Sequence, residues 1–165
     1  MELIWSELTA GLPDTSESAR VLIRMLAAMG LGAAVGYQRE RVGKEAGFRT
    51  HILVALGTAL FVIVCKSVDM DLDGLSRVIQ GIATGIGFIG TGTILKREDK
   101  SEIHGLTTAA GLFMTGAVGV AAGLGRVGLA IVATLLTLVV LSVLGRIELG
   151  ISRRAAEKAK SDTAT

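Results

Sequence analysis

The sequence contains few cysteines, prolines and aromatic residues. Of its 165 residues, one is cysteine (Cys65), one is proline (Pro13) and 4% are aromatic. A single thiol excludes an internal disulfide and a zinc site made of several cysteines. We therefore interpret Cys65 as a small apolar residue inside a helix, which is the usual role of a free cysteine.

Basic residues are absent from the start of the chain. Residues 1–19 contain no Lys or Arg, although they hold four acidic residues. A cleavable signal peptide begins with basic residues and continues into an apolar core, and this segment has neither. We expect residues 1–19 to lie outside the membrane. The candidates for the N-cap of the first long helix are Asp14, Thr15, Ser16 and Ser18.

Apolar residues dominate the rest of the chain. Half of all residues are apolar, and 22 are glycine against one proline, a composition that few soluble domains have. The apolar runs predict five helices, over residues 17–37, 51–66, 77–95, 105–125 and 127–145. The sequence therefore predicts an all-α, polytopic membrane protein whose transmembrane domain covers residues 20–146.

The basic residues gather on one side of these predicted spans. Twelve of the 17 Lys and Arg residues fall in the loops 38–50 and 96–104 or after residue 145. Cytoplasmic loops of membrane proteins are enriched in Lys and Arg, so this pattern predicts the N-terminus outside and the C-terminus inside. Residues 147–165 then form a basic cytoplasmic tail.

The predicted span at residues 77–95 is unusual because it contains five glycines. In lipid an unmade backbone hydrogen bond costs several kcal/mol, so the segment stays helical despite them. Small residues let neighbouring helices approach closely. We therefore expect this helix to be the centre of the bundle and to be contacted on more than one side. The predicted packing positions are Gly81, Gly85, Gly87, Gly90 and Gly92.

The same span contains the pattern Gly-x-Gly-x-x-Gly at residues 85–90. A dinucleotide site needs a strand before this pattern, an amphipathic helix after it and an acidic residue about 20 positions further on. Here an apolar run and a charged loop flank the pattern. Helix packing is therefore favoured over nucleotide binding.

Polar residues stand at the ends of two predicted spans. Arg49 and His51 lie where the second span enters the membrane, and ionisable groups at such a depth usually pair or face a cavity. The alternative is an ordinary basic loop whose arginines meet lipid phosphates. Arg77 and Gln80 open the third span, and we expect both to face the interior of the bundle because lipid contact would be costly.

Three aspartates, Asp69, Asp71 and Asp73, lie between the second and third predicted spans. Carboxylates suit Mg²⁺ or Ca²⁺, but a calcium loop of the EF-hand type is excluded because Gly74 follows at once and residue 80 is Gln. We favour a solvated acidic loop, with a loose outward-facing cation site as the alternative. We expect no enzyme and no cofactor, because the sequence has neither a nucleophile–base set nor a phosphate-binding Gly-Lys-Ser/Thr.

Four ordered blocks of the chain resemble one known family. They are Gly36-x-x-Arg39-Glu40, GFRTHILVALG at residues 47–57, Arg77 with TGIGFIGTG at residues 84–92, and GLTTAA at residues 105–110. In this order, over about residues 25–125, they resemble the membrane domain of the MgtC/SapB family, integral inner-membrane proteins of bacteria. For an inner-membrane protein whose N-terminus lies outside, residues 1–19 would be periplasmic. The resemblance implies importance for Arg39, Glu40, Arg49, Thr50, His51, Arg77, Gln80, Thr107 and Thr108.

The family is linked to growth at low magnesium and, in pathogens, to virulence. The resemblance implies a non-enzymatic regulator of magnesium or acid adaptation that modulates another membrane complex, such as the F-type ATP synthase. The alternative is a small transporter of Mg²⁺ or another ion or solute, working as an oligomer, with a path lined by Glu40, Arg77 and Gln80. The glycine faces predict a homo-oligomer in the lipid bilayer, and no nucleic-acid partner is expected.

The sequence departs from the family pattern in two respects. Many members carry a C-terminal soluble domain, for which too few residues follow the last predicted span. Phe113 stands where many members have Trp, which we interpret as a tolerated exchange of one aromatic residue for another.

Overall fold

The structure is a computed structural model that describes residues 1–2, 14–96 and 103–144. It contains five α-helices: α2 (Thr15–Arg41), α3 (Phe48–Ser67), α4 (Leu72–Gly92), α5 (Leu106–Gly123) and α6 (Val127–Val139), the last continued by the π-helical turn η1 (Val140–Leu144). The predicted all-α architecture is therefore confirmed. Most of the predicted N-terminal segment and the whole predicted tail lie outside the described residues.

The connection between α4 and α5 contains a pair of two-residue strands that the sequence did not predict. Strands β1 (Leu95–Lys96) and β2 (Ile103–His104) pair antiparallel. Gly105 follows β2 with φ +95°, a left-handed conformation that suits glycine. The chain thus turns sharply from the strand pair into α5.

Aspartates begin two of the helices. Asp14 is the N-cap of α2, and its carboxylate accepts a hydrogen bond from the Thr15 N–H at 2.8 Å. Asp71 is the N-cap of α4, and its carboxylate accepts from the Gly74 N–H, also at 2.8 Å. Of the three aspartates between the second and third predicted spans, Asp71 therefore has a structural role, because it caps the N-terminus of α4.

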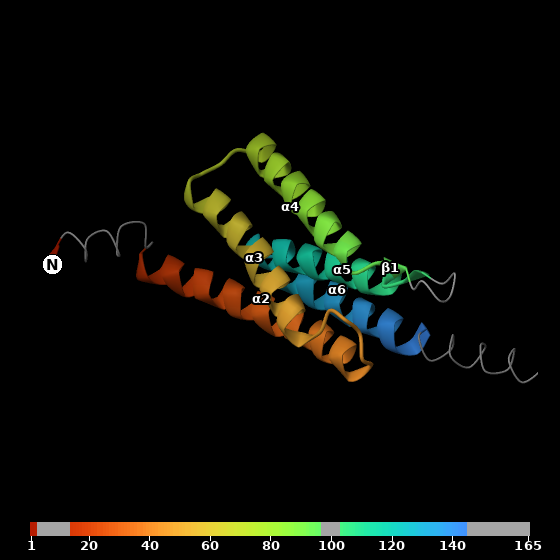
Figure 1. Ribbon diagram of the computed structural model, residues 1–165. Coiled ribbons are helices and arrows are strands. Elements are labelled where there is room, and N and C mark those ends of the chain that lie inside the picture. Colours follow the sequence, from red (N-terminus) through yellow and green to blue (C-terminus); the bar gives the residue numbers. More distant parts are fainter. Residues whose placement is uncertain (3–13, 97–102, 145–165) are drawn as a thin grey trace, which may run out of the picture.

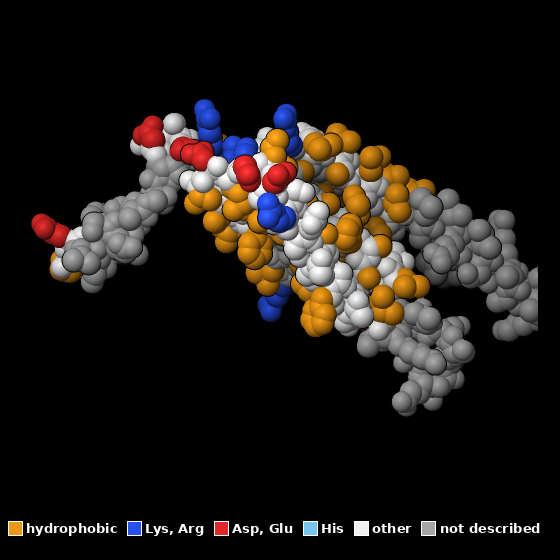
Figure 2. Space-filling view, turned by 90° about the horizontal axis from the view of Figure 1, so that it is seen from above, with side chains coloured by type: hydrophobic (Ala, Val, Ile, Leu, Met, Phe, Trp, Pro, Cys, Tyr) orange, Lys and Arg blue, Asp and Glu red, His pale blue; other side chains and the backbone are white. Residues whose placement is uncertain are grey.

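The exterior of the bundle is largely apolar. Helices α2, α3 and α5 are long and apolar enough to cross a membrane, and the apolar stretch Val127–Val143 is shorter. Large hydrophobic side chains such as Leu53, Phe61 and Leu135 are exposed along these helices. In Figure 2 hydrophobic side chains are spread over the visible face, and most of the charged ones gather toward one end. This distribution is that of a protein whose sides face lipid.

Helix α5 lies at the centre of the bundle (Figure 1). It packs against α2, α3, α4 and α6, whereas α4 packs mainly against α5 and, less extensively, against α3. The prediction that the helix at residues 77–95 forms the centre is therefore wrong. The physical reason is the placement of its large side chains: Ile82 and Ile86 share one face and bury it against α5 and α3, which leaves the other side of α4 uncovered.

Glycines and alanines bring α2, α3 and α5 close together. A Cβ added at Gly32 of α2 would lie 2.8 Å from the Ala55 Cβ of α3, and one at Gly36 would lie 2.8 Å from the Phe48 Cα. On α5, a Cβ at Gly119 would collide with the Ala55 carbonyl oxygen and with Thr58. The backbones of these helices therefore touch where side chains are missing.

Four of the five predicted packing glycines of α4 do not pack within one copy of the chain. A Cβ at Gly81, Gly85, Gly87 or Gly92 would have no atom of the described residues within 4 Å. Only at Gly90 would it meet a neighbour, the Ala109 Cβ at 3.3 Å. Within one copy, Gly90 therefore meets a neighbouring helix and the other four do not, because these four point away from the face that holds Ile82 and Ile86. Packing of the other four against a second copy stays a prediction.

Candidate functional site

Three polar side chains from three helices meet inside the bundle. Arg39 comes from the last turn of α2, His51 from the first turn of α3 and Thr108 from the first turn of α5. Their exposed fractions are 3%, 0% and 1%, so all three are buried among protein atoms. We call Arg39, His51 and Thr108 the polar core site.

Arg39 reaches this position because of its place on α2. The buried residues Ala28, Gly32, Val35 and Arg39 follow one another at intervals of four, three and four, which puts them on one face of the helix. The Arg39 Nη2 donates a hydrogen bond to the Thr108 Oγ1 at 3.0 Å. Its Nε is buried and has no hydrogen-bond partner among the described residues. The guanidinium is therefore an incompletely paired charge inside the protein, which is an expensive arrangement.

His51 is held by its own helix. Its Nδ1 lies 2.9 Å from the Gly47 carbonyl oxygen, which can only accept, so Nδ1 carries the proton of this bond. The other ring nitrogen, Nε2, is buried and has no hydrogen-bond partner in the part of the chain that the structure describes. It faces α5 at Gly111, where an added Cβ would lie 3.8 Å away. In the neutral ring, Nε2 is a free acceptor beside a glycine.

Glu40 closes the loop between α2 and α3. Its Oε2 accepts a hydrogen bond from the Phe48 N–H at 2.8 Å, and a Cβ at Gly47 would lie only 2.7 Å from the same oxygen. The carboxylate thus satisfies an N–H in the first turn of α3, where negative charge also suits the helix dipole.

The other predicted polar residues do not join the polar core site. Arg49 and Thr107 are exposed, and Thr50 is half-buried. Arg77 and Gln80 are also exposed, and they lie in the first turns of α4, near the end of α3 that is remote from His51. The prediction that Arg77 and Gln80 face the interior is therefore wrong for one copy of the chain, because both lie on the uncovered side of α4.

The structure adds Gln38, which sequence reasoning missed. Its Nε2 donates to the Leu141 carbonyl oxygen of η1 at 3.4 Å, and its Oε1 is buried with no partner within residues 14–96 and 103–144. The periodicity of α2 could have indicated this residue, because Gln38 lies one turn after the half-buried Ala34.

The polar core site offers two open hydrogen-bonding positions, a donor at the Arg39 Nε and an acceptor at the His51 Nε2. A water molecule could satisfy either position, because its oxygen accepts from an N–H and its O–H donates to a ring nitrogen. The polar core site does not fit a divalent cation, because its charged side chain, Arg39, is itself positive. No group of three His, Cys, Asp or Glu side chains that could hold a metal occurs among the described residues.

The comparisons with known proteins identify the family. Residues 25–149 match the model of the MgtC family, a range that contains the whole polar core site. The chain belongs to the MgtC family. It is accordingly a membrane protein, with α2, α3 and α5 as candidate spans. No solved structure matches it.

Relatives from three organisms share about two fifths of their residues with the matched part of the chain. Protein SrpB of Synechococcus elongatus is 42% identical over 136 residues, which are 76% of this chain and 75% of SrpB. The putative magnesium transporter YhiD of Escherichia coli K12 is 42% identical over 133 residues, 76% of this chain and 61% of YhiD. Protein MgtC of Salmonella typhimurium is 38% identical over 117 residues, 71% of this chain and 49% of MgtC. The chain thus spans about half the length of that MgtC protein.

Proposed function

We propose that this protein is a non-enzymatic protein of the bacterial inner membrane that supports adaptation to low magnesium without carrying the ion itself. The link to magnesium comes from the family and from the name of the YhiD relative. The choice of a regulator over a transporter rests on the charge at the polar core site.

A single charged side chain, Arg39, is buried among the described residues, and it is a cation. Mg²⁺ needs oxygen ligands and gives up its water reluctantly, so a positive, incompletely paired guanidinium would repel it. Deeper in the bundle, Ala55, Ala59 and Val62 of α3 are fully buried and apolar. The aspartates 69, 71 and 73 lie beyond them, at the other end of α3.

Two measurements on the same protein test this proposal. The first is Mg²⁺ uptake into sealed vesicles that contain the purified chain, where we expect no flux above that of empty vesicles. The second is growth at low Mg²⁺ of a bacterium that lacks its own member of the family, where we expect the chain to restore growth. Gradient-driven Mg²⁺ uptake would refute the regulatory role.

One observation favours the transporter as a second candidate. Arg77 and Gln80 are exposed on α4, so a polar path could form between copies of the chain. Glu40 would not belong to it, because it lies at the opposite end of the bundle and accepts from the Phe48 N–H. If vesicles do show Mg²⁺ flux, this candidate requires that Arg77→Leu and Gln80→Leu abolish it while Glu40→Gln leaves it intact.

We further propose that a second copy of the chain covers the outer face of α4, defined here by Arg77, Gly81, Thr84, Gly85 and Gly92. Small residues and threonines surround the exposed Phe88 on this face and suit helix association, and an exposed Arg77 is poorly suited to lipid. Asp73 lies one turn before Arg77, so two parallel copies of α4 could exchange these opposite charges. A complex with another membrane protein, such as ATP synthase, is the competing explanation of this face.

The oligomer is tested with a matched pair of substitutions. Gly85→Leu and Gly30→Leu both introduce a side chain where a Cβ would have no atom within 4 Å. We therefore expect both variants to fold, and only Gly85→Leu to lower the mass measured by light scattering in detergent. A monomeric parent chain would contradict self-association, and crosslinking in native membranes would then identify the partner.

The orientation of the chain remains a prediction from its charges. A reporter fused after Thr165 is expected to lie in the cytoplasm. A periplasmic reporter would overturn the orientation with the N-terminus outside and with it the assignment of the polar core site to the cytoplasmic side.

A further inference from the structure

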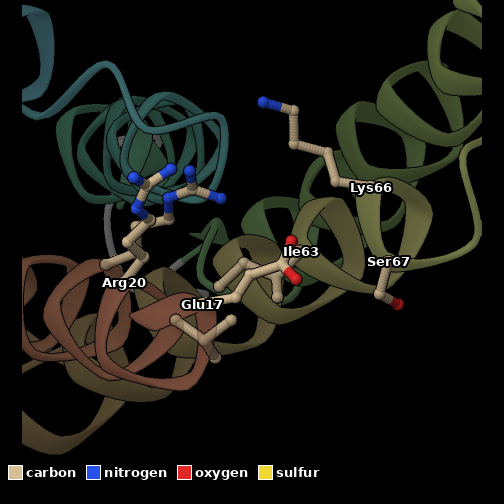
Figure 3. A pocket seen from close by; sticks show the side chains of 7 residues that line it. Glu17, Arg20, Ile63, Lys66 and Ser67 are labelled. Atoms are coloured by element: carbon tan, nitrogen blue, oxygen red, sulfur yellow. The ribbon is translucent and has the colours of Figure 1, made fainter. Parts of the chain in front are cut away.

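A second polar feature lies where α2 begins and α3 ends, remote from the polar core site. A cavity of about 60 Å³ opens there between the two helices. Its lining includes the basic side chains of Arg20, Arg24 and Lys66, and one acidic side chain, Glu17. Figure 3 shows Glu17 and Arg20 on α2 and Lys66 on α3 around this cavity. With three cations against one carboxylate, the lining has an excess of positive charge.

Two of the basic side chains, Lys66 and Arg24, contact the turn between α5 and α6. The Lys66 Nζ donates to the Leu124 carbonyl oxygen at 3.3 Å. Leu124 is the C-cap of α5, where helix carbonyls lack partners within the helix. The Arg24 guanidinium lies over Gly125, where an added Cβ would be 3.1 Å from its Nη2. Gly125 has φ +80°, so the close approach occurs at a left-handed turn that suits glycine. These cations therefore have defined positions at the cavity.

The surroundings of the cavity are apolar. Val21 and Ile63 contribute to its lining, and Ile63 is buried. Next to it along α2, Leu22 and Ile23 are exposed, and Val64 is exposed on α3. Both helices are candidate membrane spans, and the cavity lies close to their ends. Its position is therefore that of the interface between hydrocarbon and water, where lipid headgroups lie.

We propose that this cavity binds the headgroup phosphate of an anionic phospholipid, with an acyl chain lying along the exposed apolar residues of α2 and α3. A cavity of about 60 Å³ has room for several water-sized atoms, which suits a phosphate group. Guanidinium and ammonium groups are the side chains that bind phosphate oxygens. The apolar flanks favour a lipid over free phosphate. This site is separate from the proposed role in magnesium adaptation, and either can fail without the other.

The test is lipid retention by the full chain, measured by native mass spectrometry in detergent. Phosphatidylglycerol is the probe, phosphatidylcholine is the zwitterionic comparison, and inorganic phosphate is the headgroup without acyl chains. We expect one phosphatidylglycerol to be retained in preference to the other two. Arg20→Gln and Arg24→Gln should each weaken its binding about fivefold, the usual effect of one cation near an anionic lipid.

Two further variants separate this site from general charge effects. Glu17→Gln removes the acidic group of the lining and should strengthen binding by a similar factor, a gain that a folding defect cannot mimic. Arg126→Gln is the control, because Arg126 is exposed on the α5–α6 turn and is not part of the lining. It should leave binding unchanged.

Several outcomes would overturn the lipid site. Equal weakening by Arg126→Gln would indicate a diffuse surface charge, and unchanged binding in both Arg20→Gln and Arg24→Gln would remove the assignment. Equal retention of phosphatidylcholine would contradict the preference for an anionic lipid. Inorganic phosphate binding as tightly as phosphatidylglycerol would show that the ligand is a soluble anion.

Discussion

Helices α4 and α5 are both rich in glycine, yet the structure uses their glycines in opposite ways. On α5, Gly116, Gly119 and Gly123 are buried, and an added Cβ at each would press on atoms of α3 or α4. On α4, Gly81 and Gly85 point away from the bundle into open space. The number of glycines in a span therefore does not show whether that span is central. The position of the large side chains on the same helix does, because they determine which face is buried.

The two helices also differ in what their polar residues contact. Thr108 of α5 is buried and accepts from Arg39, whereas Thr84 and Thr91 of α4 are exposed and donate to carbonyl oxygens of their own helix. Thr108 thus belongs to the interior, whereas Thr84 and Thr91 belong to a surface that lipid or another protein covers.

The largest effect is expected for Gly119→Ala on α5. The new methyl group would collide with the Ala55 carbonyl oxygen, so α3 and α5 would have to separate, at a cost of about 3 kcal/mol. Thermal unfolding can be followed with a thiol-reactive dye, because Cys65, the sole cysteine, is 5% exposed in the folded chain. A melting temperature equal to that of the parent would contradict the central position of α5.

The next effect is expected for Thr108→Val. The substitution removes the hydroxyl that accepts from the Arg39 Nη2 and leaves the buried guanidinium without this bond, which should cost about 2 kcal/mol. Thr107→Val is the matched control, because Thr107 is the preceding residue and is exposed. The same dye measurement should show a loss for position 108 alone. Equal losses would mean that the hydrogen bond is unimportant.

A smaller effect is expected for Gly90→Ala. Of the five predicted packing glycines on α4, Gly90 is the one that meets a neighbour among the described residues. The new Cβ would lie 3.3 Å from the Ala109 Cβ, so the helices must shift by a few tenths of an ångström. We expect a loss of about 1 kcal/mol, in part offset by the better helix propensity of alanine. A loss as large as that of Gly119→Ala would indicate that α4 packs as tightly as α5.

The smallest effect is expected for Gly85→Ala, because the methyl group enters open space. Stability should be unchanged or raised by up to about 1 kcal/mol through helix propensity. The thermal melt of the dilute, detergent-solubilised chain checks this. A clear loss would show that a partner copy already fills this position and would support association through α4.

Part of the polar core site could be predicted from the sequence. Arg49 and His51 lie where a predicted apolar helix enters the membrane, which favoured pairing or burial for both, with an ordinary basic loop as the alternative. The structure buries His51 and leaves Arg49 exposed. For Thr108, the sequence did not identify Arg39 as the partner. Its contact with Arg39 joins residues 69 positions apart, and no local pattern predicts such a pair.

The sequence alone determined that the chain forms apolar helices, where most of them begin and end, and that the protein belongs in a membrane. These properties follow from local hydropathy, from caps such as Asp14 and from the need to satisfy every backbone hydrogen bond in lipid. The tertiary structure decided that α5 rather than α4 occupies the centre, and that Arg39 meets Thr108 while Arg77 stays outside. The physical reason is that such choices depend on which helix faces fit against one another, and that fit involves all the helices at once.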